Sequence, residues 1–115
     1  MNLSTQAIEF RQAYQIENTP SARSTQKRLI DEEYKEFCQA HATEPFVNVL
    51  KELADLVYVC YQYAENMEWD LDEAMQRVHR SNMSKLGLDG KPIRRADGKV
   101  LKGPNYQPPN LNDLV

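Results

Sequence analysis

The sequence predicts an all-α protein with four helices, followed by an irregular, basic C-terminal arm. Apolar residues recur every three or four positions along most of the chain before Met83, as expected for helices that each bury one face. Short breaks separate these stretches, and the first two of them contain proline. All 4 glycines, and four of the 6 prolines, lie after Met83, where regular helix is therefore not expected.

The first two helices are expected over residues 4–16 and about 22–41. Ser4 is the expected N-cap of the first helix, which should end near Ile16 because residues 18–21 contain Pro20. The second helix should start at Ala22 or Arg23 and end at His41. Its predicted core stripe comprises Leu29, Ile30, Tyr34, Phe37, Cys38 and His41.

The third helix is expected from about Pro45 to Asn66, with the proline in its first turn. Residues 51–64 are apolar almost all the way round, which is typical of a buried helix. Glu52 and Asp55 nevertheless lie on one face of it. The helical wheel places Lys51 elsewhere, so these two carboxylates require a cation that the local sequence does not supply.

The fourth helix should begin after Asp70 and end near Met83. Asp70 is its expected N-cap, with Glu73 in capping-box position, and its predicted inner face comprises Leu71, Ala74, Met75 and Val78. In the arm, two Asp-Gly pairs predict turns at residues 89–90 and 97–98, with a small hairpin between Ile93 and Val100. A flexible tail is the alternative interpretation.

Length and charge indicate one domain over residues 1–115, with a helical part at about 4–85 and an arm at about 86–115. Acids dominate residues 31–73 and bases dominate residues 77–102, although the net charge is only −3. This asymmetry suits a metal-plus-phosphate site, two subunits that meet acid to base, or solvated surface. The start of the chain does not resemble a signal peptide and no stretch reaches about 18 apolar residues, so we expect a cytoplasmic protein with reduced thiols.

Five carboxylates carry the predicted chemistry. Glu32, Glu33 and Glu36 belong to the second helix, and Glu52 and Asp55 to the third. If these helices pack antiparallel, the acidic pairs face each other and cannot all ionise without a cation. Oxygen ligands select a hard ion such as Mg²⁺ or Mn²⁺. Either acidic motif alone would more often be solvated surface, but Glu52 and Asp55 lie in a helix without a polar face.

These residues, Glu32-Glu33-x-x-Glu36 followed by Glu52-x-x-Asp55, resemble the signature of the all-α nucleoside triphosphate pyrophosphohydrolases. That superfamily includes MazG, the dimeric dUTPases and phosphoribosyl-ATP pyrophosphohydrolase. The resemblance covers about residues 4–85. The tail is similar to the C-terminal arm of the MazG-like and phosphoribosyl-ATP pyrophosphohydrolase-like branch, which includes phage examples.

The resemblance implies a four-helix MazG-like bundle that forms a dimer, or a dimer of dimers. It implies Mg²⁺, or Mn²⁺ in its place, held by Glu33, Glu36, Glu52 and Asp55. Glu33 and Glu32 are the implied catalytic carboxylates, with Glu32 assisting a further ion or helping to activate the water. Asn82 and Lys85 match positions that meet substrate phosphates, and weaker candidates for such contacts are Arg80, Lys91, Arg94, Lys99, Lys102 and Tyr106.

The implied reaction cleaves a (d)NTP between the α- and β-phosphates, giving (d)NMP and pyrophosphate. The tail does not resemble that of the dedicated histidine-biosynthesis enzyme, so the expected role is nucleotide-pool control or clean-up. The expected partners are a nucleoside triphosphate and further copies of the chain, and neither nucleic acid nor a membrane.

The same residues allow other interpretations. A non-catalytic helical interaction module would leave Glu52 and Asp55 unexplained. The basic arm permits nucleic-acid binding, but the acidic helices would repel a nucleic-acid backbone. Cys38, His41 and Cys60 could bind zinc, although packed core is the favoured interpretation. Base stacking by Tyr58, Tyr61 or Tyr63 is likewise less favoured than a core or subunit-interface position.

Overall fold

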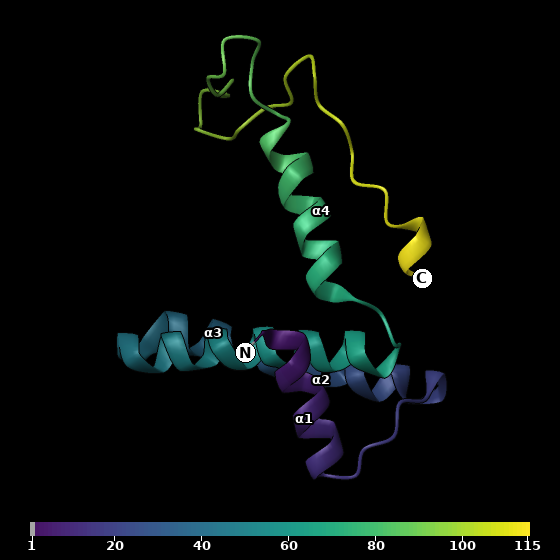
Figure 1. The fold of residues 1–115 in the computed structure, drawn as a ribbon. Helices are drawn as coiled ribbons and strands as arrows, with labels where there is room; N and C mark the ends of the chain where they lie inside the picture. Colours follow the sequence, from purple (N-terminus) through teal and green to yellow (C-terminus); the bar gives the residue numbers. More distant parts are fainter. Residues whose placement is uncertain (1) are drawn as a thin grey trace. The chain divides into compact units, whose positions relative to one another are not determined.

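The computed structural model describes residues 2–115. Its helices are α1 (Leu3–Ala13), α2 (Arg23–Thr43), α3 (Phe46–Asn66) and α4 (Leu71–Met83), with short 3-10 helices at Pro20–Ala22 and Asn112–Leu114 (Figure 1). In this described range the only strand-like pairing is one isolated bridge, so the predicted all-α class with four helices is confirmed. The chain divides into two compact units, Met1–Leu71 and Asp72–Val115.

Helix α1 starts and ends earlier than the sequence predicted. Asn2 is its N-cap, with the side-chain Oδ1 accepting a hydrogen bond from the Thr5 amide at 2.7 Å, so the prediction that Ser4 is the cap is wrong. The helix ends at Ala13 and not near Ile16, because Gln15 adopts a left-handed φ of 55°. The chain then turns back toward the side of α1.

A buried arginine connects α1 to the end of α3. Arg11 is only 3% exposed, yet its guanidinium is surrounded by acceptors. Its Nε donates to Asn18 at 2.7 Å, its Nη1 to Gln62 at 3.3 Å and its Nη2 to Asn66 at 3.0 Å. The Nη2 group also donates to the backbone oxygen of Glu17 at 3.1 Å. These bonds offset the cost of removing the charge from water and hold the loop after α1 in place.

Helices α2 and α3 form the main pair of the first unit. Only Glu44 and Pro45 connect them, so the chain must reverse and the helices run antiparallel, side by side in Figure 1. Helix α1 also packs against α3. Between residues 2 and 115, the buried apolar residues are Ala7, Ala40 and Ala64. These small side chains allow the helices to approach closely.

Much of the apolar surface of α2 and α3 is exposed, so two burial predictions are wrong for the chain by itself. Of the predicted α2 stripe, Ile30 and Phe37 are half-buried and the other four residues are exposed. In the stretch of α3 predicted to be buried, residues 51–64, Leu53 is 43% exposed, Val57 41% and Tyr58 39%. Within the first unit only α1 and α2 pack against α3, and two helices are too few to cover it on all sides.

The second unit consists of α4 and the arm that returns along it. Helix α4 begins directly after Asp70 and ends at Met83, as predicted. The arm meets the helix end where the Gly103 amide donates to the Lys85 oxygen at 2.8 Å. A Cβ at Gly103 would collide with the backbone oxygens of Lys85 and Leu86, so only glycine permits this approach. The yellow segment of Figure 1 then runs back beside α4.

The predicted hairpin in the arm is confirmed in a short form. The Leu101 amide donates to the Ile93 oxygen at 2.7 Å, and Arg94 pairs with Val100 in an antiparallel bridge. Both Asp-Gly pairs form turns, and Gly98 has a φ of 89°. The arm is therefore irregular but has a defined hydrogen-bonded path. None of the helices described between residues 2 and 115 is long and apolar enough to cross a membrane.

Candidate metal centre and substrate-binding residues

Three of the predicted carboxylates come together between α2 and α3. Glu33 and Glu36 are three residues apart on α2 and share a face, and Glu52 projects from α3. One carboxylate oxygen from each of these three residues lies within 4.8 Å of the other two. Three oxygen donors at this spacing form a group that is able to hold a hard cation.

The electrostatics of this cluster favour a positive ligand. Burial raises the pKa of Glu33, and the charges of Glu36, Asp55 and Glu52, with a hydrogen bond to Glu36, raise it further. The Oε2 atoms of Glu33 and Glu52 are buried and have no hydrogen-bond partner among the described residues. Buried oxygens of this kind are normally paired, and the residues therefore fit a divalent cation.

Asp55 lies outside the three-glutamate group, and its carboxylate pairs with Lys51. The Lys51 Nζ lies 2.7 Å from Asp55 Oδ2 and 3.4 Å from Glu52 Oε1, and these contacts raise the pKa of Lys51. The expectation that Lys51 points away is wrong, because residues four apart share a helix face and a lysine side chain is long and flexible. Asp55 remains close enough for its charge to act on Glu33, but its carboxylate is engaged by Lys51.

Glu32 is exposed on α2 and lies outside the three-glutamate cluster. Its carboxylate therefore faces water, whereas its neighbour Glu33 is half-buried between the two helices.

The predicted phosphate-binding residues all belong to the second unit. Asn82 is exposed near the end of α4, and Lys85 is half-buried just beyond it. Arg80 is exposed, with its Nη2 3.6 Å from Glu73. Along the arm, Lys102 lies over the ring of Tyr106, with Nζ 4.8 Å from the ring centre. The remaining three candidates, Lys91, Arg94 and Lys99, are exposed around the hairpin.

The acidic residues of α2 and α3 lie within a part of the chain that matches a known protein family. The sequence model of the phosphoribosyl-ATP pyrophosphohydrolase family matches residues 5–82. The chain belongs to this family. It is therefore a pyrophosphohydrolase of the all-α, MazG-like superfamily, a hydrolase that acts on phosphoric anhydrides. A comparison with curated proteins found no match.

Members of this family generally use a divalent metal, and the cluster of Glu33, Glu36 and Glu52 supplies suitable donors. The match includes α2 and α3 with all five acidic residues, and it ends at Asn82. Most of the basic arm therefore lies beyond the matched residues.

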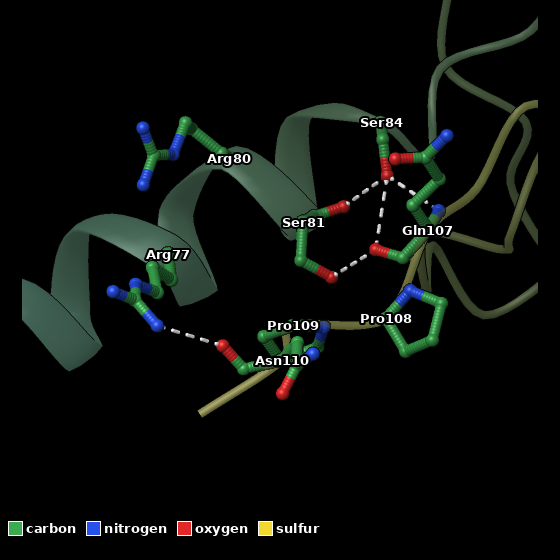
Figure 2. A pocket seen from close by; sticks show the side chains of 8 residues that line it. All are labelled: Arg77, Arg80, Ser81, Ser84, Gln107, Pro108, Pro109 and Asn110. Carbon is green, nitrogen blue, oxygen red and sulfur yellow. Dashed lines mark hydrogen bonds between the residues drawn. The ribbon is translucent and has the colours of Figure 1, made fainter. Parts of the chain in front are cut away.

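In this pyrophosphohydrolase, α4 and the returning arm enclose a groove of about 330 Å³ that sequence reasoning missed (Figure 2). Ser81 Oγ donates to the Gln107 oxygen at 2.7 Å, and the Gln107 amide donates to Ser84 Oγ at 2.9 Å. Arg77 Nη1 donates to the Asn110 oxygen at 3.0 Å. The available signal was the spacing of residues 77, 81 and 84, which places three polar side chains on one helix face.

The two cysteines are free thiols, and no disulfide joins them. Cys60 is half-buried and burial raises the pKa of its thiol, whereas Cys38 is exposed, so the prediction that Cys38 packs in a core is wrong. Across residues 2–115, Cys38, Cys60 and His41 do not form a metal-competent group.

Proposed function

We propose that the chain is a Mg²⁺-dependent hydrolase that cleaves a (d)NTP between its α- and β-phosphates, releasing (d)NMP and pyrophosphate for nucleotide-pool control or clean-up. The observation that carries this proposal is the cluster of Glu33, Glu36 and Glu52, with two buried carboxylate oxygens that have no partner among the described residues. Hydrolysis of phosphoric anhydrides is the chemistry of the family.

Glu33, Glu36 and Glu52 are the residues that would hold the ion. Asp55 would complete the set once its carboxylate leaves Lys51, which is exposed and can turn into solvent. Mn²⁺ offers the same preference for oxygen ligands and could replace Mg²⁺. A bound ion of this kind supplies charge neutralisation for the phosphates of the substrate.

Side chains of the protein are proposed to accept the proton of the attacking water and to bind the phosphates of the substrate. Glu32 is exposed and directly precedes Glu33 in the sequence, and it is the proposed acceptor of the proton from the attacking water. The water oxygen bonds to phosphorus, the bridging P–O bond of the α–β anhydride breaks, and pyrophosphate leaves. Asn82 and Lys85 are the proposed phosphate contacts, with weaker contributions from Arg80, Lys91, Arg94, Lys99, Lys102 and Tyr106.

The substrate has two candidate classes. The family match favours phosphoribosyl-ATP, which contains the same type of α–β anhydride. The form of the tail favours simple nucleoside triphosphates, and we retain these as the proposed substrates. We further propose a cytoplasmic homodimer, or a tetramer made of two dimers, and the exposed apolar face of α3 supports self-association.

The test is a hydrolysis panel containing each NTP and dNTP and phosphoribosyl-ATP, with and without Mg²⁺, and with products separated by ion-exchange chromatography. Asp55→Ala and Glu36→Ala should each lower kcat/KM by at least about 100-fold, because each removes a proposed metal ligand. Asp31→Ala is the matched control, since Asp31 is a surface acid of α2 that pairs with Lys27.

Full activity in both Asp55→Ala and Glu36→Ala would contradict the ligand assignment. If the wild type cleaves none of these nucleotides and its melting temperature does not respond to Mg²⁺, the interaction-module interpretation replaces the enzymatic one.

A further inference from the structure

Lys51 is the positive group nearest to the proposed metal ligands in the first unit. Its Nζ lies 2.7 Å from Asp55 Oδ2 and 3.4 Å from Glu52 Oε1, so one ammonium group contacts two of these ligands. Across residues 2–115, no other basic side chain forms a salt bridge with any of the proposed ligands. Lys51 is therefore their counter-ion in the metal-free protein.

The three side chains of this contact differ in their access to solvent. That of Glu52 is 15% exposed, that of Asp55 37% and that of Lys51 65%. The Oε2 atom of Glu52 is buried without a hydrogen-bond partner among the described residues, whereas its Oε1 atom contacts the lysine. The ammonium group thus lies on the solvent side of these carboxylates, where a ligand arriving from water can reach it.

Lys51 and a divalent ion compete for the same carboxylates. Asp55 cannot keep its full contact with the lysine while its oxygens ligate an ion, because the two positive groups would repel each other at this range. An exposed ion pair between residues four apart is weak, so Lys51 can leave at small cost. Its backbone directly precedes Glu52, so the released ammonium group remains beside the cluster.

A released lysine at this place is suited to binding phosphate. Mg²⁺ held by carboxylates usually keeps coordination positions for water and for substrate phosphates. One divalent ion offsets only half of the charge of four ionised carboxylates, so an approaching phosphate still meets negative charge. An ammonium group reduces this repulsion and donates hydrogen bonds to phosphate oxygens. The phosphate contacts predicted from the sequence all belong to the second unit, whereas Lys51 belongs to the first.

We propose that Lys51 exchanges partners during the reaction: it pairs with Asp55 and Glu52 in the metal-free protein, and it binds the phosphate chain of the substrate once a divalent ion occupies the cluster. Lys51 therefore weakens binding of the ion and strengthens binding of the phosphates. This inference rests on the proposed function, because it concerns the same metal site, but it does not depend on which nucleotide is cleaved.

Two titrations followed by NMR test this exchange. The first ligand is Mg²⁺ alone. The second, added at saturating Mg²⁺, is a tripolyphosphate analogue with methylene bridges, which has the phosphate chain of both candidate substrate classes but no base and no anhydride bond. In Lys51→Met, Mg²⁺ should bind about two- to fivefold more tightly, the size of one exposed ion pair. The analogue should bind about tenfold more weakly, the size of one hydrogen bond between charged groups.

Lys27→Met is the matched control. Lys27 is 64% exposed and lies 2.8 Å from Asp31, four residues further along α2, so this variant loses the same kind of ion pair and the same charge. Neither dissociation constant should change in it. Lys51→Arg keeps a positive group that binds phosphate, and it should return both constants toward the wild-type values.

Equal Mg²⁺ affinity in the wild type and Lys51→Met would overturn the inference, and so would equal affinity for the analogue. Equal effects of Lys27→Met and Lys51→Met would also overturn it, because they would reflect net charge alone. If the titrations behave as expected but the wild type hydrolyses no nucleotide, the proposed function fails and the exchange of partners stands. A wild type that binds no Mg²⁺ would overturn both.

Discussion

Burial and three neighbouring carboxylates act together on Glu33. Its folded-state pKa is raised, so the folded protein binds this proton more tightly than the unfolded chain does. The contribution of Glu33 to the free energy of unfolding is therefore fully present below the ordinary glutamate pKa of about 4.3. It is lost as pH rises through the raised pKa of the folded state. Without metal, the cluster works against folding at neutral pH.

Glu33→Gln should increase the free energy of unfolding at pH 7 without metal by about 0.5–1 kcal/mol, because glutamine resembles the protonated acid and removes like-charge repulsion. The gain over wild type should be small near pH 4 and grow as pH rises. Mg²⁺ should then reverse the order by stabilising only the wild type. Urea unfolding across this pH range measures all three effects.

Glu32→Gln is the matched control, since this neighbouring carboxylate is exposed. A gain in Glu33→Gln that is the same at pH 4 and pH 7 would show that repulsion within the cluster is not its cause.

The cluster was predictable from sequence, but the position of Lys51 was not. Spacing of three on each helix and a short connection together indicate that Glu33, Glu36 and Glu52 converge. A helical wheel gives the direction in which a side chain leaves the backbone. It does not say where the end of a four-carbon side chain will lie. The ion pair between Lys51 and Asp55 was therefore not predicted.

Among the elements, the helices were easier to predict than the contacts of the arm. Apolar periodicity and Pro45 indicate where α2 and α3 begin and end. The return of the arm along α4 depends on single hydrogen bonds between residues far apart in sequence. The spacing of Arg77, Ser81 and Ser84 indicates a shared helix face, but it does not indicate which distant residues this face contacts, and their roles were therefore missed.

Arg77 holds the last turn of the chain. Its guanidinium makes a bidentate contact with Asp113, at 2.5 and 3.0 Å, and this contact lowers the pKa of the aspartate. In Arg77→Ala, the Leu114 amide, which donates to Leu111, should exchange with solvent about three- to tenfold faster. Hydrogen exchange followed by NMR measures this rate.

The Gln107 amide bonds to Ser84 and should keep its protection in Arg77→Ala. Arg80→Ala is the matched control on the same helix and should leave Leu114 unchanged. Equal acceleration in both variants would argue against a specific role for Arg77 in holding the C-terminal turn.

For the molecule as a whole, the exposed stripe of α3 has consequences for assembly. Its apolar residues Phe46, Leu50, Leu53 and Val57 follow each other at intervals of four, three and four, the spacing that packs one helix against another. A single sequence predicts that this helix needs cover. It does not distinguish a second helix of the same chain from a second copy, and the burial prediction failed for that reason.

Leu50→Glu should weaken self-association by at least about 100-fold, because a charge would be buried at the centre of the stripe. Sedimentation velocity at several protein concentrations measures this change. Leu88→Glu, at an 80% exposed position of the second unit, is the control and should associate like the wild type. A wild type that remains monomeric at high concentration would exclude self-association through this face.

The buried arginine of α1 also bears on biosynthesis. Its partners Gln62 and Asn66 lie 51 and 55 residues further along the chain. As a ribosome releases the polypeptide from its N-terminus, Arg11 cannot leave water until α3 has been translated to its last turn. Helix α1 is therefore synthesised well before the residues that anchor it, and a nascent chain halted before Asn66 would lack the hydrogen bond from Arg11 to Asn66.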